Sequence, residues 1–305
     1  MSQTIFIGSI NMDVVMRVKN FPKPGETIKC LDFQYIPGGK SSNQCASARR
    51  LGAEVKLIGR IGNDSFGEIL LNYLNNEKID SSDVVRSATK PSGTAIIFVN
   101  EKSENMIVVS GGANDEISPK DINDINITRE DIVIATLEHP QDATMALFSK
   151  ARIAGAITIL NAAPALPLLD GLLDTVDYLI INEIELATYA ESKITNNIEH
   201  VIELSKKIRH KKKQKIIVTL GNKGVVCINN DEIIKVDARK VDSLDTTAAG
   251  DCFVGAFAVA LAEGKNLHYA LEFANVAASI SVTRFCASSS LPDRNEVDSI
   301  INSNI

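Results

Sequence analysis

The sequence lacks the long hydrophobic run, the paired cysteines and the histidine motif that mark several protein classes. Its best candidate for a membrane span, residues 252–262, has 11 residues, about half of what a spanning helix needs, and indicates a buried helix. The five cysteines are odd in number and form no C-x-x-C pair, and the four histidines form no H-E-x-x-H motif. These absences argue against a disulfide framework and a typical zinc site, and they favour a reducing compartment.

Clustered positive charge is also missing. The chain carries 38 acidic and 32 basic residues, a net charge of −6, whereas binding to nucleic acid needs clustered Lys and Arg against the phosphates. One basic run, residues 206–215, is typical of a solvated helix end. The first residues lack the layout of a signal peptide, so we expect a cytoplasmic protein with neither nucleic acid nor membrane as partner.

The composition of the 305 residues is average for a globular protein, with 45% hydrophobic and 23% charged residues. Apolar runs typical of buried strands alternate with helical patterns, which predicts an α/β fold of three layers around a mostly parallel sheet. The expected strands are 4–10, 26–36, 55–61, 94–99, 105–110, 131–137, 157–161, 178–181, 216–220 and a hairpin at 224–236; the expected helices are 41–51, 66–76, 143–154, 198–209, 249–263 and 267–282.

The extra strands around 12–36 and 92–110 are more polar than the others. They fit poorly in a sheet that is covered on both faces. We expect them to form a small separate sheet over the mouth of the main one.

The strongest chemical signal is the segment DTTAAGDCF at residues 245–253, which opens an apolar helix. The free N–H groups at a helix N-terminus suit a phosphate, and small residues let a ligand approach the backbone. Asp251 is the only charged residue from 246 to 262, and it is placed to take a proton from an attacking hydroxyl group. The alternative is purely structural: Thr247 or Asp251 caps the helix.

Two further segments lie near the N-terminus. Asn11 and Asp13 follow the first expected strand, where ligands bind in open α/β sheets. Residues 38–44, GGKSSNQ, form a glycine turn that leads into a helix, but Gln34 replaces the first glycine of a Walker A motif. Turn formation alone is an alternative for each segment.

Two more segments follow later strands. Asn182, Glu183 and Glu185 offer oxygen atoms that organise Mg²⁺ through water, or they form the acidic first turn of a helix. Residues 219–224, TLGNKG, suit a ligand at a strand end or a plain hairpin turn. No G-x-G-x-x-G motif occurs, which disfavours a dinucleotide-dependent oxidoreductase.

Together, in this order and spacing, these motifs resemble the ribokinase-like carbohydrate kinase family. Its two specific signatures are GGK-x-x-NQ at residues 38–44 and DT-x-AAGD at residues 245–251, and the similarity runs from about residue 5 to residue 297. Segments 8–13, 21–27, 112–114, 137–138 and 160–165 most resemble the members that phosphorylate ribose. The resemblance implies a single kinase domain over residues 1–305, with a β lid from about 12–37 and 92–110 that is often also a homodimer surface.

The resemblance also implies a role for each matching position. Asp251 is the catalytic base, and the backbone of Ala248, Ala249 and Gly250 forms an anion hole. The sugar-binding positions are Asn11, Asp13, Gly39, Lys40, Asn43 and Glu138. The nucleotide-binding positions are Asn182, Thr219, Leu220, Gly221, Gly224, Gly250 and Asn275. Mg²⁺ is expected near Asn182 and Glu185, and an activating K⁺ near Asp245, Thr247, Ser281, Arg284, Cys286 and Ser290, largely through carbonyl oxygens.

Two departures from the family pattern bear on these roles. Ser41 and Ser42 stand where a Gly-Ala pair is usual, which adds two hydroxyl groups beside the sugar pocket. Cys286 stands where a glycine is usual in the K⁺ loop, and a carbonyl ligand survives that change only if the backbone there does not demand a positive φ.

The predicted reaction is the transfer of the γ-phosphoryl group of ATP to O5 of D-ribose, with Asp251 as base and Mg²⁺ bridging the phosphate oxygens. One alternative is a related kinase for another sugar, such as deoxyribose or fructose, for a sugar acid or for a nucleoside. Another is a non-catalytic sugar-binding protein on the same fold, since fold alone does not guarantee function.

Overall fold

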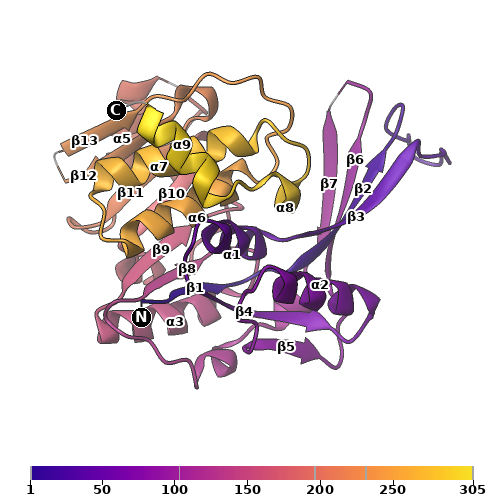
Figure 1. The fold of residues 1–305 in the computed structure, drawn as a ribbon, viewed down its shortest axis with the longest axis horizontal. Helices are drawn as coiled ribbons and strands as arrows, with labels where there is room; N and C mark the ends of the chain where they lie inside the picture. Colours follow the sequence, from indigo (N-terminus) through magenta and orange to yellow (C-terminus); the bar gives the residue numbers. More distant parts are fainter. Residues whose placement is uncertain (1, 103, 196, 231, 304–305) are drawn as a thin grey trace.

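The computed structural model describes residues 2–102, 104–195, 197–230 and 232–303, and these form two separate sheets with helices around the larger one (Figure 1). The ends of the expected domain, residue 1 and residues 304–305, lie outside the described residues. No helix in the described part combines the length and the hydropathy of a membrane span.

The larger sheet has nine strands within the described residues, in the order β13-β12-β11-β10-β9-β8-β1-β4-β5. The strands from β11 to β5 pair in parallel, and β12 and β13 extend the sheet antiparallel at one edge. The bounds are β1 (Thr4–Ile7), β4 (Val55–Gly62), β5 (Val84–Ser87), β8 (Ile132–Ala135), β9 (Ile157–Asn161), β10 (Tyr178–Asn182), β11 (Lys215–Thr219), β12 (Val225–Asn229) and β13 (Glu232–Val236).

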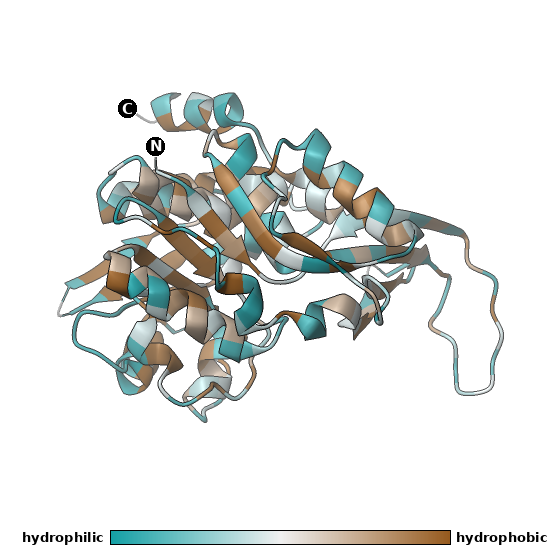
Figure 2. Ribbon diagram, turned by 90° about the horizontal axis from the view of Figure 1, so that it is seen from below, coloured by the Kyte–Doolittle hydropathy of each residue, from teal (hydrophilic) through white to brown (hydrophobic). Residues whose placement is uncertain are grey.

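Helices cover both faces of this sheet because successive strand residues point to opposite sides. In β1, Phe6 belongs to one hydrophobic cluster, and Ile5 and Ile7 belong to the other. The first cluster packs under α1 (Lys40–Arg50), α2 (Ser65–Asn76), α6 (Ala249–Ala262), α7 (Leu267–Ser281) and α9 (Arg294–Ser303); the second packs under α3 (Gln141–Ala154), α4 (Glu183–Tyr189) and α5 (Ile198–Ile208). Figure 2 shows the hydrophobic strands between the helices. The predicted three-layer α/β fold is therefore confirmed.

The smaller sheet has the order β3-β2-β6-β7 and projects to one side of the main body (Figure 1). Its strands are β2 (Asn11–Arg17), β3 (Asp32–Gly38), β6 (Gly93–Val99) and β7 (Asn105–Ser110). They come from the two segments that the sequence assigned to a separate sheet. Every residue of β7 is exposed, so its outer edge has no covering layer among the described residues.

Several expected boundaries were wrong. The first strand ends at Ile7 instead of residue 10, because the chain turns at Gly8, with φ 141°, to leave the main sheet for the smaller one. Asn11 and Asp13 therefore lie in a strand and not in a loop after the first strand. The exposed strand begins at Asp32 and not at residue 26. The sequence also missed β5, α9 and the short helix α8 (Ala287–Ser290).

Candidate active site

The first turn of α6 is free of side-chain caps. Ala248 occupies the N-cap position in a left-handed conformation, with φ 61°, and no side chain accepts a bond from the turn that follows. The Thr247 hydroxyl group instead donates to Asp245 Oδ1 over 2.6 Å. The capping alternative for Thr247 and Asp251 is therefore wrong. The N–H of Ala249 donates to the Thr246 carbonyl oxygen, whereas Ala248, Gly250 and Asp251 line a cavity.

Asp251 points from α6 toward α1. Its Oδ1 accepts a hydrogen bond of 3.0 Å from Gln44 Nε2, and its Oδ2 lies 3.4 Å from Asn43 Nδ2. Only 7% of the residue is exposed. Burial raises the pKa of this carboxyl group, and Lys40 together with the two amides opposes the rise.

A cavity of about 200 Å³ lies in front of this carboxylate, at the carboxyl ends of β9, β10 and β11. It is the place where open α/β sheets bind ligands. No atom lies within 4 Å of the position that a Cβ of Gly250 would take, so an anion has room against the backbone. The residues that line it are Lys40, Asn161, Ala163, Ile180, Ile181, Asn182, Glu185, Thr219, Thr246, Ala248, Gly250 and Asp251.

The expected sugar-binding side chains gather beside Asp251. Glu138 Oε2 accepts bonds from Ser9 Oγ at 2.5 Å and from the backbone N–H of Lys40 at 3.2 Å. Burial raises the pKa of Asp13 to about 7, with further contributions from Glu138 and Asp251. The contacts that the structure does give are the bond from the Lys40 backbone to Glu138 and the contact of Asn43 with Asp251, and both link these acids to the start of α1.

Two tight contacts lie beside these acidic side chains. Asn114 Nδ2 donates to Asn11 Oδ1 over 2.7 Å and holds the Asn11 amide in one orientation. Gly39 has φ 90°, and a Cβ there would lie 2.7 Å from the Ser9 carbonyl oxygen and 2.8 Å from the Asn11 nitrogen. A glycine is thus required where β3 turns into α1.

Lys40 is the cation of the site. Burial alone would lower the pKa of its amine, but Asp251, Glu138, Glu185 and Asp13 together raise that pKa above its ordinary value. The amine therefore stays charged among four carboxyl groups, which is the arrangement expected of a group that meets an anionic substrate.

Asn182 and Glu185 form a reciprocal cap at the start of α4. Asn182 Oδ1 accepts from the N–H of Ile184 and of Glu185, and Glu185 Oε2 accepts from the N–H of Asn182 over 2.8 Å. The structural alternative for this segment is thus confirmed. Both residues also line the cavity, and in the described part no three His, Cys, Asp or Glu side chains group as direct metal ligands. Such a donor set fits Mg²⁺ that is held mainly by water and phosphate oxygens.

The expected nucleotide positions are only partly brought together. Thr219 lines the cavity, and Leu220, Gly221 and Gly224 make the tight turn from β11 into β12, as the hairpin alternative proposed. Asn275 does not line the cavity. Its Nδ2 donates to the Asp237 carbonyl oxygen over 2.8 Å and holds the segment after β13.

The six expected K⁺ residues lie before α6 and between the end of α7 and the end of α8. Asp245 Oδ2 accepts from the N–H of Cys286 over 3.0 Å, and Ser281 Oγ lies 2.9 Å from Ser290 Oγ, whereas Arg284 pairs with Glu296. Cys286 adopts φ 70° and ψ 153°, a conformation that is otherwise almost confined to glycine. A carbonyl ligand was expected to survive the change from glycine only if the backbone did not need a positive φ. The φ of Cys286 is positive, so this condition is not met.

The serine at position 41 does not add a hydroxyl group to the sugar pocket. Ser41 Oγ donates to the Ile7 carbonyl oxygen and lies 3.0 Å from Thr136 Oγ1, beneath the site. Ser42 is fully buried, and its hydroxyl group has no hydrogen-bond partner among the described residues. The expectation of two hydroxyl groups beside the pocket is corrected for Ser41, because Ile7 in β1 and Thr136, directly after β8, are its hydrogen-bond partners.

Sequence reasoning missed four residues that support the site: Ser9, Gln44, Asn114 and Asn161. Each bonds to a residue at least 100 positions away in the sequence. All four stand in segments that the sequence analysis singled out, at 8–13, 38–44, 112–114 and 160–165, but none of the four was given a role there.

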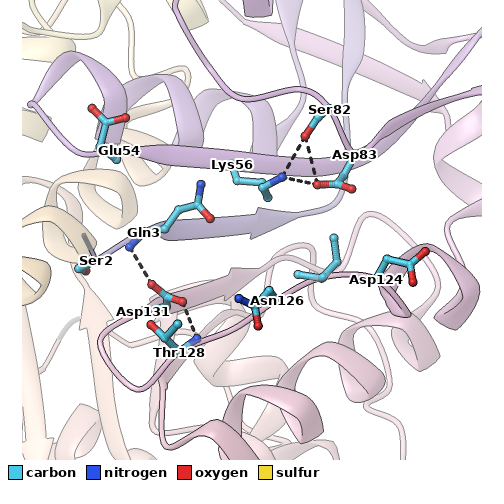
Figure 3. Close-up of a pocket in the computed structure, with 11 residues that line it drawn as sticks. Ser2, Gln3, Glu54, Lys56, Ser82, Asp83, Asp124, Asn126, Thr128 and Asp131 are labelled. Atoms are coloured by element: carbon cyan, nitrogen blue, oxygen red, sulfur yellow. Dashed lines mark hydrogen bonds and ion pairs between the residues drawn. The ribbon is translucent and has the colours of Figure 1, made fainter.

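A larger cavity, of about 580 Å³, lies at the amino ends of β1, β4 and β8 (Figure 3). Several of its charged groups already have partners: Lys56 pairs with Asp80 at 3.0 Å and with Asp83, and Asp131 accepts from the N–H of Gln3 and of Thr128. Because these groups are satisfied, this cavity offers less chemistry than the smaller one.

Comparison with known proteins points to the same chemistry as the smaller cavity, a base beside a site for an anion. A family model described as pfkB family carbohydrate kinase matches residues 1–294. The chain belongs to this family. The predicted resemblance is thereby confirmed, and the shared fold places the motifs at 38–44 and 245–251 of this carbohydrate kinase on either side of the cavity.

Relatives with full coverage are ribokinases. The chain is 38% identical to ribokinase of Bacillus subtilis over 297 residues, covering 97% of this chain and 98% of the relative. It is 33% identical to ribokinase of Staphylococcus aureus, covering 98% and 99%. Among solved structures, Arabidopsis thaliana ribokinase complexed with ribose and ATP matches with a TM-score of 0.89 at 29% identity, over 99% of both chains.

Proposed function

We propose that this carbohydrate kinase transfers the γ-phosphoryl group of ATP to O5 of D-ribose and releases ribose 5-phosphate and ADP. The observation that carries the proposal is the position of Asp251, whose carboxylate faces the same cavity as the uncapped first turn of α6. The ribokinase relatives, one of them solved with ribose and ATP, support ribose as the sugar.

The proposed mechanism uses three groups of this chain. Asp251 accepts the proton of the O5 hydroxyl group as that oxygen attacks the γ-phosphorus in line, and the bond from phosphorus to the β,γ-bridging oxygen of ATP breaks. The N–H groups of Ala248, Gly250 and Asp251 and the Lys40 amine stabilise the negative charge on the transferring group. Asn182 and Glu185 would hold Mg²⁺ through water, and the ion would neutralise phosphate charge.

In this proposal the sugar lies between the smaller sheet and α1. Asn11 and Asp13 reach it from β2, Asn43 from α1, and Glu138 from the segment after β8, where they bond the hydroxyl groups that select the sugar. Asn43 Oδ1 is buried and has no partner among the described residues, so it is available to a ligand.

A panel of sugars tests the assignment. Release of ADP is measured with ribose, deoxyribose, fructose, a sugar acid and a nucleoside at equal concentration. We expect the highest kcat/KM with ribose. A higher value with any other member of the panel would replace ribose, and no turnover with any of them would leave a sugar-binding protein as the better reading.

We further infer a homodimer that forms through the smaller sheet. One edge strand, β7, carries Met106, Ile107, Val108 and Val109 with 47–60% of each residue exposed, and the opposite edge strand, β3, carries Phe33 and Tyr35 at about half exposed. An apolar edge of this kind is normally covered. Light scattering on the purified protein should give twice the mass of the chain, and Val108→Lys should give the single mass.

Two expectations remain predictions. Activation by K⁺ would show as a higher rate in KCl than in NaCl at equal ionic strength, and identical rates would remove the K⁺ site. A cytoplasmic location agrees with the five cysteines, which are all unpaired in the described residues, because disulfides are rare in that compartment.

A further inference from the structure

Gln44 is a fully buried residue of α1 that connects the proposed base to the centre of the main sheet. Its Nε2 donates to Asp251 Oδ1 over 3.0 Å and to Asn161 Oδ1 over 3.0 Å. These two bonds use both protons of the amide nitrogen. The residue is therefore held from two sides, by α6 and by the end of β9.

The direction of the Gln44 amide is fixed by Asn161. Asn161 Nδ2 donates to the Ile180 carbonyl oxygen over 3.1 Å, so Asn161 turns its oxygen toward Gln44. A flipped Gln44 amide would set its own oxygen against two acceptors, Asn161 Oδ1 and Asp251 Oδ1. Gln44 Oε1 has no partner among the described residues, so nothing on that side favours the flip.

The two oxygens of Asp251 are consequently unequal. Oδ1 carries a well-formed bond from Gln44, whereas Oδ2 has only the 3.4 Å contact with Asn43, which is at the limit of a hydrogen bond. A sugar that binds Asn43 would release that contact. Oδ2 is thus the oxygen that stays available for a proton.

We propose that Gln44 is a positioning residue for Asp251: its amide holds Oδ1, so that Oδ2 accepts the proton of the substrate, and Asn161 sets the direction of that amide. The inference rests on the proposed function, because it takes Asp251 as the base. Gln44 does not line the cavity and touches neither substrate in this arrangement.

Packing between α1 and α6 does not by itself require a polar side chain at this position. A Cβ on Gly255 would lie 2.5 Å from the Gln44 carbonyl oxygen, so the two helices are already in close contact through their backbones. Ser47 Oγ, one turn further along α1, donates to the Cys252 carbonyl oxygen over 3.1 Å. The interface therefore contains a second buried hydrogen bond that does not involve the base.

Other charged groups also set the ionisation of Asp251. Lys40 faces it from α1, Asp13 from β2, Glu138 from the segment after β8 and Glu185 from α4. The hydrogen bond from Gln44 favours the ionised form, so its removal raises the pKa of Asp251 while these neighbours stay in place.

Gln44→Met tests the proposal, since methionine keeps the volume and removes the donor. We expect kcat with ribose to fall about 10- to 100-fold near pH 7, the size expected for one hydrogen bond to a charged group. KM for ribose should stay within about threefold. The acidic limb of the pH profile of kcat/KM should move up by about one pH unit or more, so that part of the loss is recovered at high pH.

Ser47→Ala is the matched control, because it removes a buried hydrogen bond between the same two helices. It should lower the melting temperature without moving the pH profile. The proposal is overturned if Gln44→Met keeps the wild-type kcat and profile, or if both variants lose the same activity with unmoved profiles. Should Gln44→Met fail to fold, Gln44→Glu answers the same question: a carboxyl group against Asp251 should move the acidic limb further upward, and an unmoved limb contradicts the proposal.

Asp251→Asn separates this inference from the proposed function. If Asp251→Asn keeps the wild-type kcat, the base is wrong and the role of Gln44 falls with it. If Asp251→Asn is inactive and Gln44→Met behaves as wild type, only the positioning role is wrong.

Discussion

The two ends of the main sheet differ in how their polar groups are satisfied. At the amino ends, the cavity of about 580 Å³ contains ion pairs and capped carboxylates, such as Lys56 with Asp83 and Asp131 with two backbone N–H groups (Figure 3). At the carboxyl ends, the cavity of about 200 Å³ adjoins carboxyl groups with raised pKa values, a buried lysine and an uncapped helix. Unsatisfied polar groups mark the site better than volume does.

Buried atoms without partners show the same contrast. Among the described residues, Ser42 Oγ, Asn43 Oδ1, Gln44 Oε1 and His139 Nδ1 lie close to the carboxyl ends of the strands, and Tyr73 Oη in α2 lies apart from them. Leaving such groups unpaired costs about 1–3 kcal/mol each unless a ligand or water binds them. The concentration of this cost at the carboxyl ends is what a ligand-binding site at that end would produce.

The largest effect should appear when one acid at each end of the sheet is neutralised in turn and the two kcat values are compared. Asp251→Asn should lower kcat by roughly 10²- to 10⁴-fold, because general base catalysis is lost, while the sugar still binds. Asp124→Asn, in the amino-end cavity, should leave kcat within about twofold. Steady-state kinetics and calorimetry with ribose measure both, and a comparable loss of kcat in the two variants would break the comparison.

The next effect concerns Asp13 and the stability of the protein. Its folded-state pKa of about 7 lies above the unfolded value of 3.8, so the folded protein binds the extra proton, and stability falls as the pH rises from about 4 to 7. Asp13→Asn removes this loss. We expect its melting temperature to exceed the wild type by roughly 3 °C or more at pH 8 and to match it near pH 4. KM for ribose should rise about tenfold or more, since a hydroxyl contact is lost.

Equal melting temperatures of Asp13→Asn and the wild type at pH 8 would contradict the burial of an ionised Asp13. A higher melting temperature with unchanged KM would instead remove Asp13 from the sugar contacts while leaving the electrostatic argument intact.

A smaller effect is expected at the amino ends. Lys56→Met removes the partner of Asp80 and Asp83, and it should lower the free energy of unfolding by about 1 kcal/mol with no change in kcat. Urea unfolding at low and high salt measures the first quantity, and the loss should shrink as salt screens the two acids. A threefold or larger change in kcat would give this cavity a part in the reaction.

The smallest effect concerns backbone strain at the carboxyl ends. Cys286→Gly should raise the free energy of unfolding by about 1 kcal/mol, because glycine adopts φ 70° and ψ 153° without strain. Urea unfolding also measures this change. A lower stability would mean that contacts of the thiol outweigh the strain, and Cys252→Ala, which changes a buried cysteine with ordinary helical backbone, should be destabilising and serves as the control.

The sequence predicted the elements whose signal is local. Residues 157–161, ITILN, form a mostly apolar, β-branched run, and β9 has those bounds. α9 was missed because only Val297 and Ile301 of its ten residues are buried, which leaves a weak hydrophobic pattern. β5 was missed because it is four residues long, with Val85 and Arg86 exposed.

The residues of the candidate site also divide into those with a local sequence signal and those without one. Asp251 and the glycines at 38–39 stand in short motifs that can be found by inspection. The hydrogen bond from Gln44 to Asp251 joins residues 207 positions apart, and the one from Gln44 to Asn161 joins residues 117 apart. Such contacts depend on how α1, α6 and β9 pack in three dimensions, and a single sequence contains no local pattern for them.

The smaller sheet has a consequence for the way in which the enzyme recognises its sugar. Asn11 and Asp13 begin β2, which pairs with β3 and β6 and, in the described part of the chain, with no strand of the main sheet. Asn11 and Asp13 are thus carried by a sheet that has no strand pairing with the sheet beneath Asp251. If these two side chains bind the sugar, substitutions in β3 or β6, the strands that pair with β2, would alter sugar affinity without any contact with the sugar.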